Sequence, residues 1–286
     1  MRDHDTQHYI TMSAFSKLFR HKTCNILGMI HVPALPGSPA SSAGMAEILE
    51  RVEHEAEVYR GAGLGGVVLE NMHDTPYCRA PDIQPQVTAC MAVLAARVRA
   101  LLPPAMPVGV QVLAAANREA LAVAVAAGLQ FVRVEGFVFG HVADEGWVDA
   151  CAGPLLRYRR AIGGDHVAVL CDIKKKHSAH AVTADVDIVD TARAARFFRC
   201  DGVIVTGGGT GEAASPAEVA AVVGGVGGAG GVAVLVGSGV TAANLAHYSG
   251  AQGLIIGSEF KVDGNWEKEI DEERVRKVME AARQLR

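Results

Sequence analysis

An aspartate and a lysine two residues apart, Asp172 and Lys174, end an apolar segment that reads VAVLCDIK. Side chains alternate between the two faces of a strand, so these two are expected to point to the same side. A carboxylate can act as a general base while a neighbouring ammonium group supplies a proton or stabilises an enolate. The pair predicts proton transfer next to a carbonyl, with Asp172 as base or lysine partner. Lys174 would be the acid or enolate stabiliser, and a Schiff-base role for it also stays open.

Other apolar segments also end in polar residues. These are His31, Glu70, Gln111, Arg133, Glu135 and Thr206. We expect Glu70 and Glu135 to be a second acid or base, and His31 and His177 to hydrogen-bond the substrate. The alternative for Arg133 is a structural ion pair with one of the carboxylates.

A metal ion is a further option for the carboxylates. Glu70, Glu135 and Asp172 would suit Mg²⁺ or Mn²⁺, which prefer oxygen ligands. No spacing in the sequence defines such a site, so the cofactor stays unknown at this stage.

Glycine-containing turns follow three of the apolar segments. Glycine lets backbone N–H groups close on an anion, above all where a helix begins, and residues 241–248 are expected to form such a helix. We therefore predict a phosphate site. Its expected residues are Gly207, Gly208, Gly209, Gly237, Ser238, Gly239, Gly257 and Ser258.

Eight short segments rich in Val and Ile are expected to be strands. They cover residues 25–31, 66–71, 108–113, 131–136, 167–174, 202–207, 232–239 and 253–258. Their nearly continuous hydrophobicity is typical of parallel strands covered on both faces, and amphipathic helical stretches lie between them. The pattern predicts a (β/α)8 TIM barrel over residues 24–286, with the polar strand ends at its mouth. An open doubly wound sheet is disfavoured because no G-x-G-x-x-G follows the first strand.

Composition limits the partners. The 286 residues are 50% hydrophobic with a net charge of −4, so the chain offers no general attraction for nucleic acid or an anionic membrane. Its six cysteines are scattered without a CxxC pair, which favours a reducing compartment. We expect a phosphorylated small-molecule ligand, no membrane-spanning segment and a cytoplasmic location, and leave open whether like chains associate. Residues 1–23 are expected to be a disordered tail or, alternatively, a mitochondrial targeting peptide, since residues 12–22 are mildly basic and amphipathic.

Six motifs in order along the chain resemble the BtpA family. They read ILGMIHVPALPGSP from residue 26, ENMHDTP from 70, GVQVL from 109, DIKKKHS from 172, VTGGGTG from 205 and VGSGVT from 236. The resemblance implies a TIM barrel of the ribulose-phosphate-binding kind. It brings no settled reaction, because one member is implicated in photosystem I accumulation while others resemble enzymes of sugar metabolism. Many members have Asn where Gln111 stands and another residue at Glu135, so the substrate half of the mouth departs from the pattern.

The residues and the resemblance together predict an isomerase, epimerase or lyase acting on a phosphorylated sugar or related metabolite. A hydrolase of glycosidic bonds or a nucleosidase, using two rim carboxylates, is the second interpretation. A noncatalytic assembly or stability factor that retains a metabolite site is the third.

Overall fold

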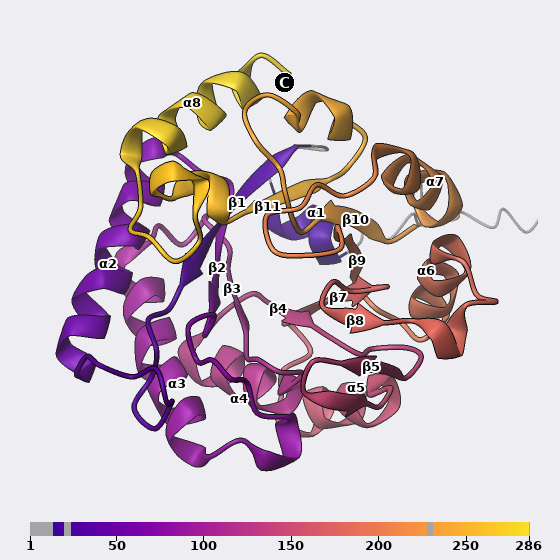
Figure 1. The fold of residues 1–286 in the computed structure, drawn as a ribbon, viewed down its shortest axis with the longest axis horizontal. Coiled ribbons are helices and arrows are strands. Elements are labelled where there is room, and N and C mark those ends of the chain that lie inside the picture. Colours follow the sequence, from indigo (N-terminus) through magenta and orange to yellow (C-terminus); the bar gives the residue numbers. More distant parts are fainter. Residues whose placement is uncertain (1–13, 20–23, 228–230, 286) are drawn as a thin grey trace, which may run out of the picture.

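Eight parallel strands close into a barrel in the computed structural model, which describes residues 14–19, 24–227 and 231–285 (Figure 1). In chain order the strands are β1 (Asn25–His31), β2 (Gly66–Glu70), β3 (Val108–Gln111), β4 (Phe131–Val134), β7 (Ala168–Ile173), β9 (Gly202–Val205), β10 (Ala233–Val236) and β11 (Gly253–Ile256). Strand β11 pairs with β1 and so closes the ring. The predicted (β/α)8 TIM barrel is confirmed.

Helices surround the strands and cover their outer faces (Figure 1). They are α2 (Met45–Ala62), α3 (Pro85–Leu101), α4 (Asn117–Ala127), α5 (Ala152–Ala161), α6 (Ile188–Phe197), α7 (Pro216–Val226) and α8 (Glu272–Arg283). Each buries an apolar stripe against the strands, as Val275, Val278 and Met279 do on α8. Within the described residues, no helix is both long and apolar enough to cross a membrane.

The helix expected over residues 241–248 is absent, and this prediction is wrong. Only a 3₁₀ turn, η3 (Leu245–Tyr248), connects β10 to β11. The Asn244 side chain accepts a hydrogen bond from the Thr241 N–H (2.8 Å) and donates one to the Gly239 carbonyl (2.8 Å). Such local side-chain bonds compete with a first helical turn, so no helix N-terminus points at the barrel mouth here.

A small antiparallel sheet lies beside β4 and β7 (Figure 1). It contains β5 (His141–Ala143), β6 (Gly146–Val148) and β8 (Ser178–Ala179). The first two strands follow β4 in the chain and the third follows β7. These strands could not be predicted from the sequence, because segments of two or three residues carry no measurable alternation.

Apolar side chains fill the amino-terminal end of the barrel. Helix α1 (Ala14–Leu18) lies within the segment expected to be a tail, yet Phe15 and Phe19 are buried in one cluster with Phe131. The Phe15 and Phe19 rings stack with centroids 4.2 Å apart. Phe15 and Phe19 therefore contribute to the barrel core. Residues 1–13 and 20–23 of the predicted tail or targeting peptide lie outside the described part.

Candidate functional site

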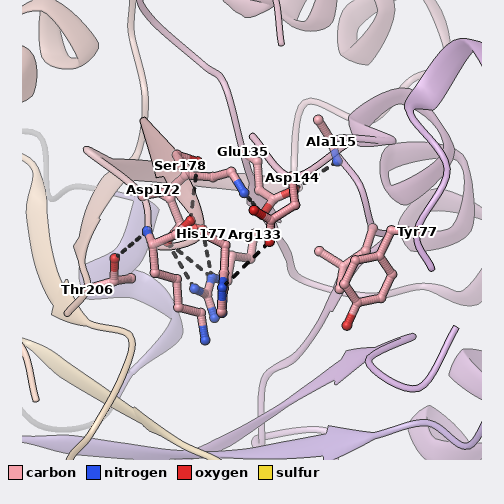
Figure 2. A network of polar contacts seen from close by, with 12 residues as sticks. Tyr77, Ala115, Arg133, Glu135, Asp144, Asp172, His177, Ser178 and Thr206 are labelled. Atoms are coloured by element: carbon pink, nitrogen blue, oxygen red, sulfur yellow. Dashed lines mark hydrogen bonds and ion pairs between the residues drawn. The ribbon is translucent and has the colours of Figure 1, made fainter. Parts of the chain in front are cut away.

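An ion pair spans the inside of the barrel between β4 and β7 (Figure 2). The Arg133 Nε donates to both carboxylate oxygens of Asp172, at 3.1 and 3.2 Å, and both side chains are at least 96% buried. Burial alone would lower the pKa of Arg133, but Asp172 and Glu70 raise it, so the guanidinium stays charged. Burial raises the pKa of Asp172, and Arg133 opposes that rise. The structural ion pair left open for Arg133 is therefore present, with Asp172 as its partner.

A second buried pair lies beside the first. The Lys175 ammonium is 3.2 Å from a Glu135 oxygen. The Ala115 N–H donates to the other oxygen of Glu135 at 2.8 Å (Figure 2). Burial alone would raise the pKa of Glu135, but Lys175 and the Ala115 N–H lower it. Glu135 thus remains an anion that is already paired.

Lys174 forms no ion pair with Asp172, and this expected pairing is wrong, although both residues line a small cavity of about 20 Å³. Strand β7 ends at Ile173, and Lys174 has a left-handed backbone with φ of 46°, so the strand alternation does not extend to it. Its ammonium instead donates to the Thr183 carbonyl (2.7 Å) and hydroxyl (3.1 Å). The following two lysines, Lys175 and Lys176, turn into the barrel in its place.

The mouth of the barrel contains a cavity of about 150 Å³, here called the central cavity. Charged and polar side chains line its floor, and turns after β10 and β11 line its wall. Its residues include His31, Glu70, Arg133, Lys176, Thr210, Gly237, Ser238, Gly239, Gly257 and Ser258. Of the three candidate metal-binding carboxylates, only Glu70 lines it.

Two hydrogen bonds hold Lys176 in the central cavity, one from its backbone and one from its side chain. Its N–H donates to the Thr206 hydroxyl (3.0 Å), and its ammonium lies 3.2 Å from the Thr210 hydroxyl. Burial and the nearby Arg133 lower the pKa of Lys176, and Glu70 opposes them. Burial raises the pKa of Glu70, against the effect of Arg133 and Lys176. The cavity thus holds a carboxyl group that ionises less readily than usual and an ammonium group that loses its proton more readily.

His31 occupies the opposite side of the central cavity. Its Nδ1 lies 3.4 Å from the Trp266 carbonyl oxygen, which can only accept, so Nδ1 carries the proton. Burial, with Lys261, lowers the pKa of His31 well below its ordinary value, so the ring is neutral. A Cβ built on Gly257 would lie 2.8 Å from Nε2, so this lone pair sits next to the glycine turn. His31 can therefore accept a hydrogen bond from a bound molecule.

The glycine turns differ in which of their hydrogen-bonding groups are free to bind a ligand. Among the described residues, none accepts a hydrogen bond from the backbone N–H of Gly239, Gly257 or Ser258. The Ser238 hydroxyl is already engaged: it accepts from the Gly207 N–H (2.6 Å) and donates to the Glu212 carbonyl (2.8 Å). Gly239 has φ of 62°, and a Cβ there would lie 2.3 Å from the Ala213 backbone, so only glycine fits.

The predicted glycine run 207–209 does not line the central cavity. The Glu212 carboxylate lies against Gly208 and Gly209, where it would repel an anion. Thr210 and Gly211, which the sequence analysis did not select, line the cavity instead. His177 also lies away from the floor, because its ring is half exposed and contacts the Thr210 hydroxyl at 3.0 Å.

The carboxylates do not fit a metal ion. Arg133 holds Asp172 and Lys175 holds Glu135, which leaves Glu70 without a second free carboxylate. In the described part of the chain, no three His, Cys, Asp or Glu side chains are placed to bind a metal together. No step that needs a metal is derived from these residues.

The fold and the site define a TIM-barrel protein with a polar cavity at the carboxyl ends of its strands. Residues 21–284 match the BtpA family, and the chain belongs to that family. It is 47% identical over 274 residues to "Uncharacterized protein F13E9.13, mitochondrial" of Caenorhabditis elegans, covering 95% of this chain and 97% of that one. It is 32% identical over 257 residues to "Photosystem I biogenesis protein BtpA" of Synechocystis, covering 90% and 87%.

Among solved structures, the chain is similar to KGPDC from Streptococcus mutans in complex with a sugar phosphate. The TM-score is 0.56 at 12% identity, and the match covers 92% of this chain and 98% of that one. At this identity the similarity shows the fold alone.

Proposed function

We propose that the protein is an enzyme that moves a proton next to the carbonyl group of a phosphorylated sugar or related metabolite, as an isomerase, epimerase or lyase. The observation that carries the proposal is that Glu70 and Lys176 share the central cavity with the unpaired N–H groups of two glycine turns. The turns follow the seventh and eighth barrel strands, where TIM barrels often hold phosphate. The sugar phosphate bound to KGPDC, a protein of the same fold, adds support for this ligand class.

Each group in the central cavity has a proposed role. The N–H groups of Gly239, Gly257 and Ser258 bind the phosphate oxygens of the substrate. The Lys176 ammonium places a positive charge between the phosphate and the carbonyl group of the substrate. Glu70 takes the proton from the carbon next to the carbonyl, since its raised pKa makes it a stronger base than an exposed carboxylate. Lys176 stabilises the enolate oxygen and can return a proton to it, the role first expected of Lys174. His31 accepts a hydrogen bond from a substrate hydroxyl through Nε2.

Asp172 and Glu135 do not act as bases in this proposal. They position the side chains of Arg133 and Lys175, with which they form ion pairs. The first keeps Arg133 on the cavity floor, and the second keeps Lys175 out of the cavity. Cleavage of a glycosidic bond needs two carboxyl groups on either side of one bond. Glu70 and Glu259 both line the central cavity, but the Glu259 carboxylate pairs with Arg274 at 2.6 Å. Glu70 is thus left without a second unpaired carboxylate in the lining, and the hydrolase and nucleosidase interpretation loses its main support.

The test is a screen of phosphosugars by NMR in D₂O. Proton transfer next to a carbonyl replaces hydrogen by deuterium even without net conversion, so the assay detects reaction in either direction. We expect at least one aldose or ketose phosphate to exchange, and the unphosphorylated sugar to exchange far more slowly. No exchange across the panel would contradict the enzyme proposal and favour an assembly role, as the name of the cyanobacterial relative suggests for that protein.

For location, we propose the mitochondrion over the cytoplasm. The support is the name of the Caenorhabditis elegans relative. Fusion of residues 1–23 to a fluorescent protein tests it: mitochondrial fluorescence is expected, and diffuse fluorescence would contradict it.

A further inference from the structure

A second cavity of about 640 Å³, here called the outer cavity, lies between α2 and the loop that joins β11 to α8. His31 lines both this cavity and the central cavity, so the two share a wall. The roles proposed above use only the central cavity. The outer cavity is therefore a place where a larger part of the same substrate could bind.

The loop on one side of the outer cavity is fixed at its base. The Val262 N–H donates to the Glu269 carbonyl (3.0 Å), and the Asp271 N–H donates to the Phe260 carbonyl (2.8 Å). The buried Lys261 ammonium pairs with Glu55 of α2, which ties the loop to the helix. Trp266 lies midway along the loop, between two ends that these bonds fix to the rest of the barrel.

Aromatic rings gather where the two cavities meet. The Trp266 and His73 rings have centroids 5.0 Å apart, and the His31 ring lies 6.3 Å from Trp266 with a nearly perpendicular plane. His73 and Trp266 line the outer cavity with His31, and Trp266 also packs beside Met72. A small sugar phosphate in the central cavity would leave these surfaces uncovered.

Charged and polar groups surround the aromatic surface. They include Glu47, Glu50, Arg51, His54 and Lys268. An apolar face with donors and acceptors of both signs around its edge suits a flat heterocyclic ring, which offers an apolar face and polar edge atoms.

We propose that the substrate carries a planar, heteroaromatic ring on its phosphorylated sugar, with the phosphate in the central cavity and the ring against Trp266 in the outer cavity. This inference rests on the proposed function, because it uses the phosphate end as its anchor. His31 lies between the two parts, and its bond to the Trp266 carbonyl couples the sugar site to the ring site.

The experiment compares D-ribose 5-phosphate with AMP, GMP, CMP and UMP, which add a ring to the same sugar phosphate. Because their sugar has no free carbonyl form, these nucleotides serve as non-reacting probes of binding. Binding is followed by tryptophan fluorescence in a Trp147→Phe background, which leaves Trp266 as the single tryptophan of the chain. Isothermal calorimetry repeats the measurement for variants that lack Trp266. We expect at least one nucleotide to bind about tenfold or more tightly than D-ribose 5-phosphate, and to quench the fluorescence.

Two substitutions of Trp266 distinguish the loss of ring stacking from a general disturbance of the structure. Trp266→Ala should reduce nucleotide affinity to that of D-ribose 5-phosphate while leaving affinity for D-ribose 5-phosphate unchanged. Trp266→Phe should restore most of the difference, because a phenyl ring still stacks.

Equal affinity for D-ribose 5-phosphate and all four nucleotides would overturn the ring proposal and leave the proposed function standing. An equal loss for both ligand types in Trp266→Ala would also overturn it. Failure of the proposed function looks different: D-ribose 5-phosphate itself would not bind, or Lys176→Met would leave its affinity unchanged.

Discussion

Replacing Lys176 by Met tests the assignment of the cavity lysine. The substitution removes the ammonium group that lies 3.2 Å from the Thr210 hydroxyl in the central cavity of about 150 Å³. A preorganised charge at a developing oxyanion contributes about a hundredfold or more in turnover, or about 2.7 kcal/mol of barrier. We expect that loss in kcat, measured by deuterium exchange on the substrate found in the screen.

The same substitution should not destabilise the fold. Burial lowers the pKa of Lys176, which means that the folded state penalises its charge below that pKa. An apolar side chain of similar length removes the penalty. The midpoint of thermal unfolding at pH 7 is therefore expected to stay the same or rise.

Lys174→Met is the matched control. It removes two hydrogen bonds to Thr183 outside the central cavity, so it should cost about 1–2 kcal/mol in the free energy of unfolding. Turnover should stay close to that of the wild type. A hundredfold loss in Lys174→Met with normal turnover in Lys176→Met would refute the reasoning and restore the lysine first expected from the sequence.

Three further results are expected. Asp172→Asn leaves the Arg133 charge buried without its partner, so urea denaturation should show a loss of about 3–5 kcal/mol in unfolding free energy; a change near zero would contradict the structural role of this pair. The pH profile of kcat/KM should be bell-shaped. The acid limb should have its midpoint above pH 4.5, because Glu70 must be ionised and its pKa is raised. The alkaline limb should have its midpoint below pH 10.5, because Lys176 must be protonated and its pKa is lowered. Midpoints outside this pH range would exclude these two groups. Ser238→Ala removes both hydrogen bonds that join the turn after β10 to residues 207 and 212, so calorimetry should show weaker phosphate-ester binding and urea denaturation a loss of about 1–3 kcal/mol; unchanged binding would mean that this turn does not form the anion site.

The barrel itself could be predicted from the sequence because parallel strands covered on both faces leave a continuous apolar signal. The inward positions of Glu70, Arg133 and Asp172 also followed from strand alternation. They lie inside regular strands, where the period of two holds.

The prediction failed where the chain leaves regular structure. A positive φ at Lys174 reverses the direction of the side chains, and nothing in the run of three lysines reveals which one turns inward. The place of Gly208 and Gly209 depends on the conformation of their own loop, because the Glu212 carboxylate lies against them once the loop has folded. The place of Trp266 likewise depends on the fixed base of its loop.

A crystal structure with D-ribose 5-phosphate tests the central claim most directly. The account predicts phosphate density within hydrogen-bonding distance of the N–H groups of Gly239 and Ser258, with the sugar directed toward Glu70 and Lys176. Phosphate bound only in the outer cavity or on the outer surface of the barrel, or no density at a saturating concentration, would contradict it.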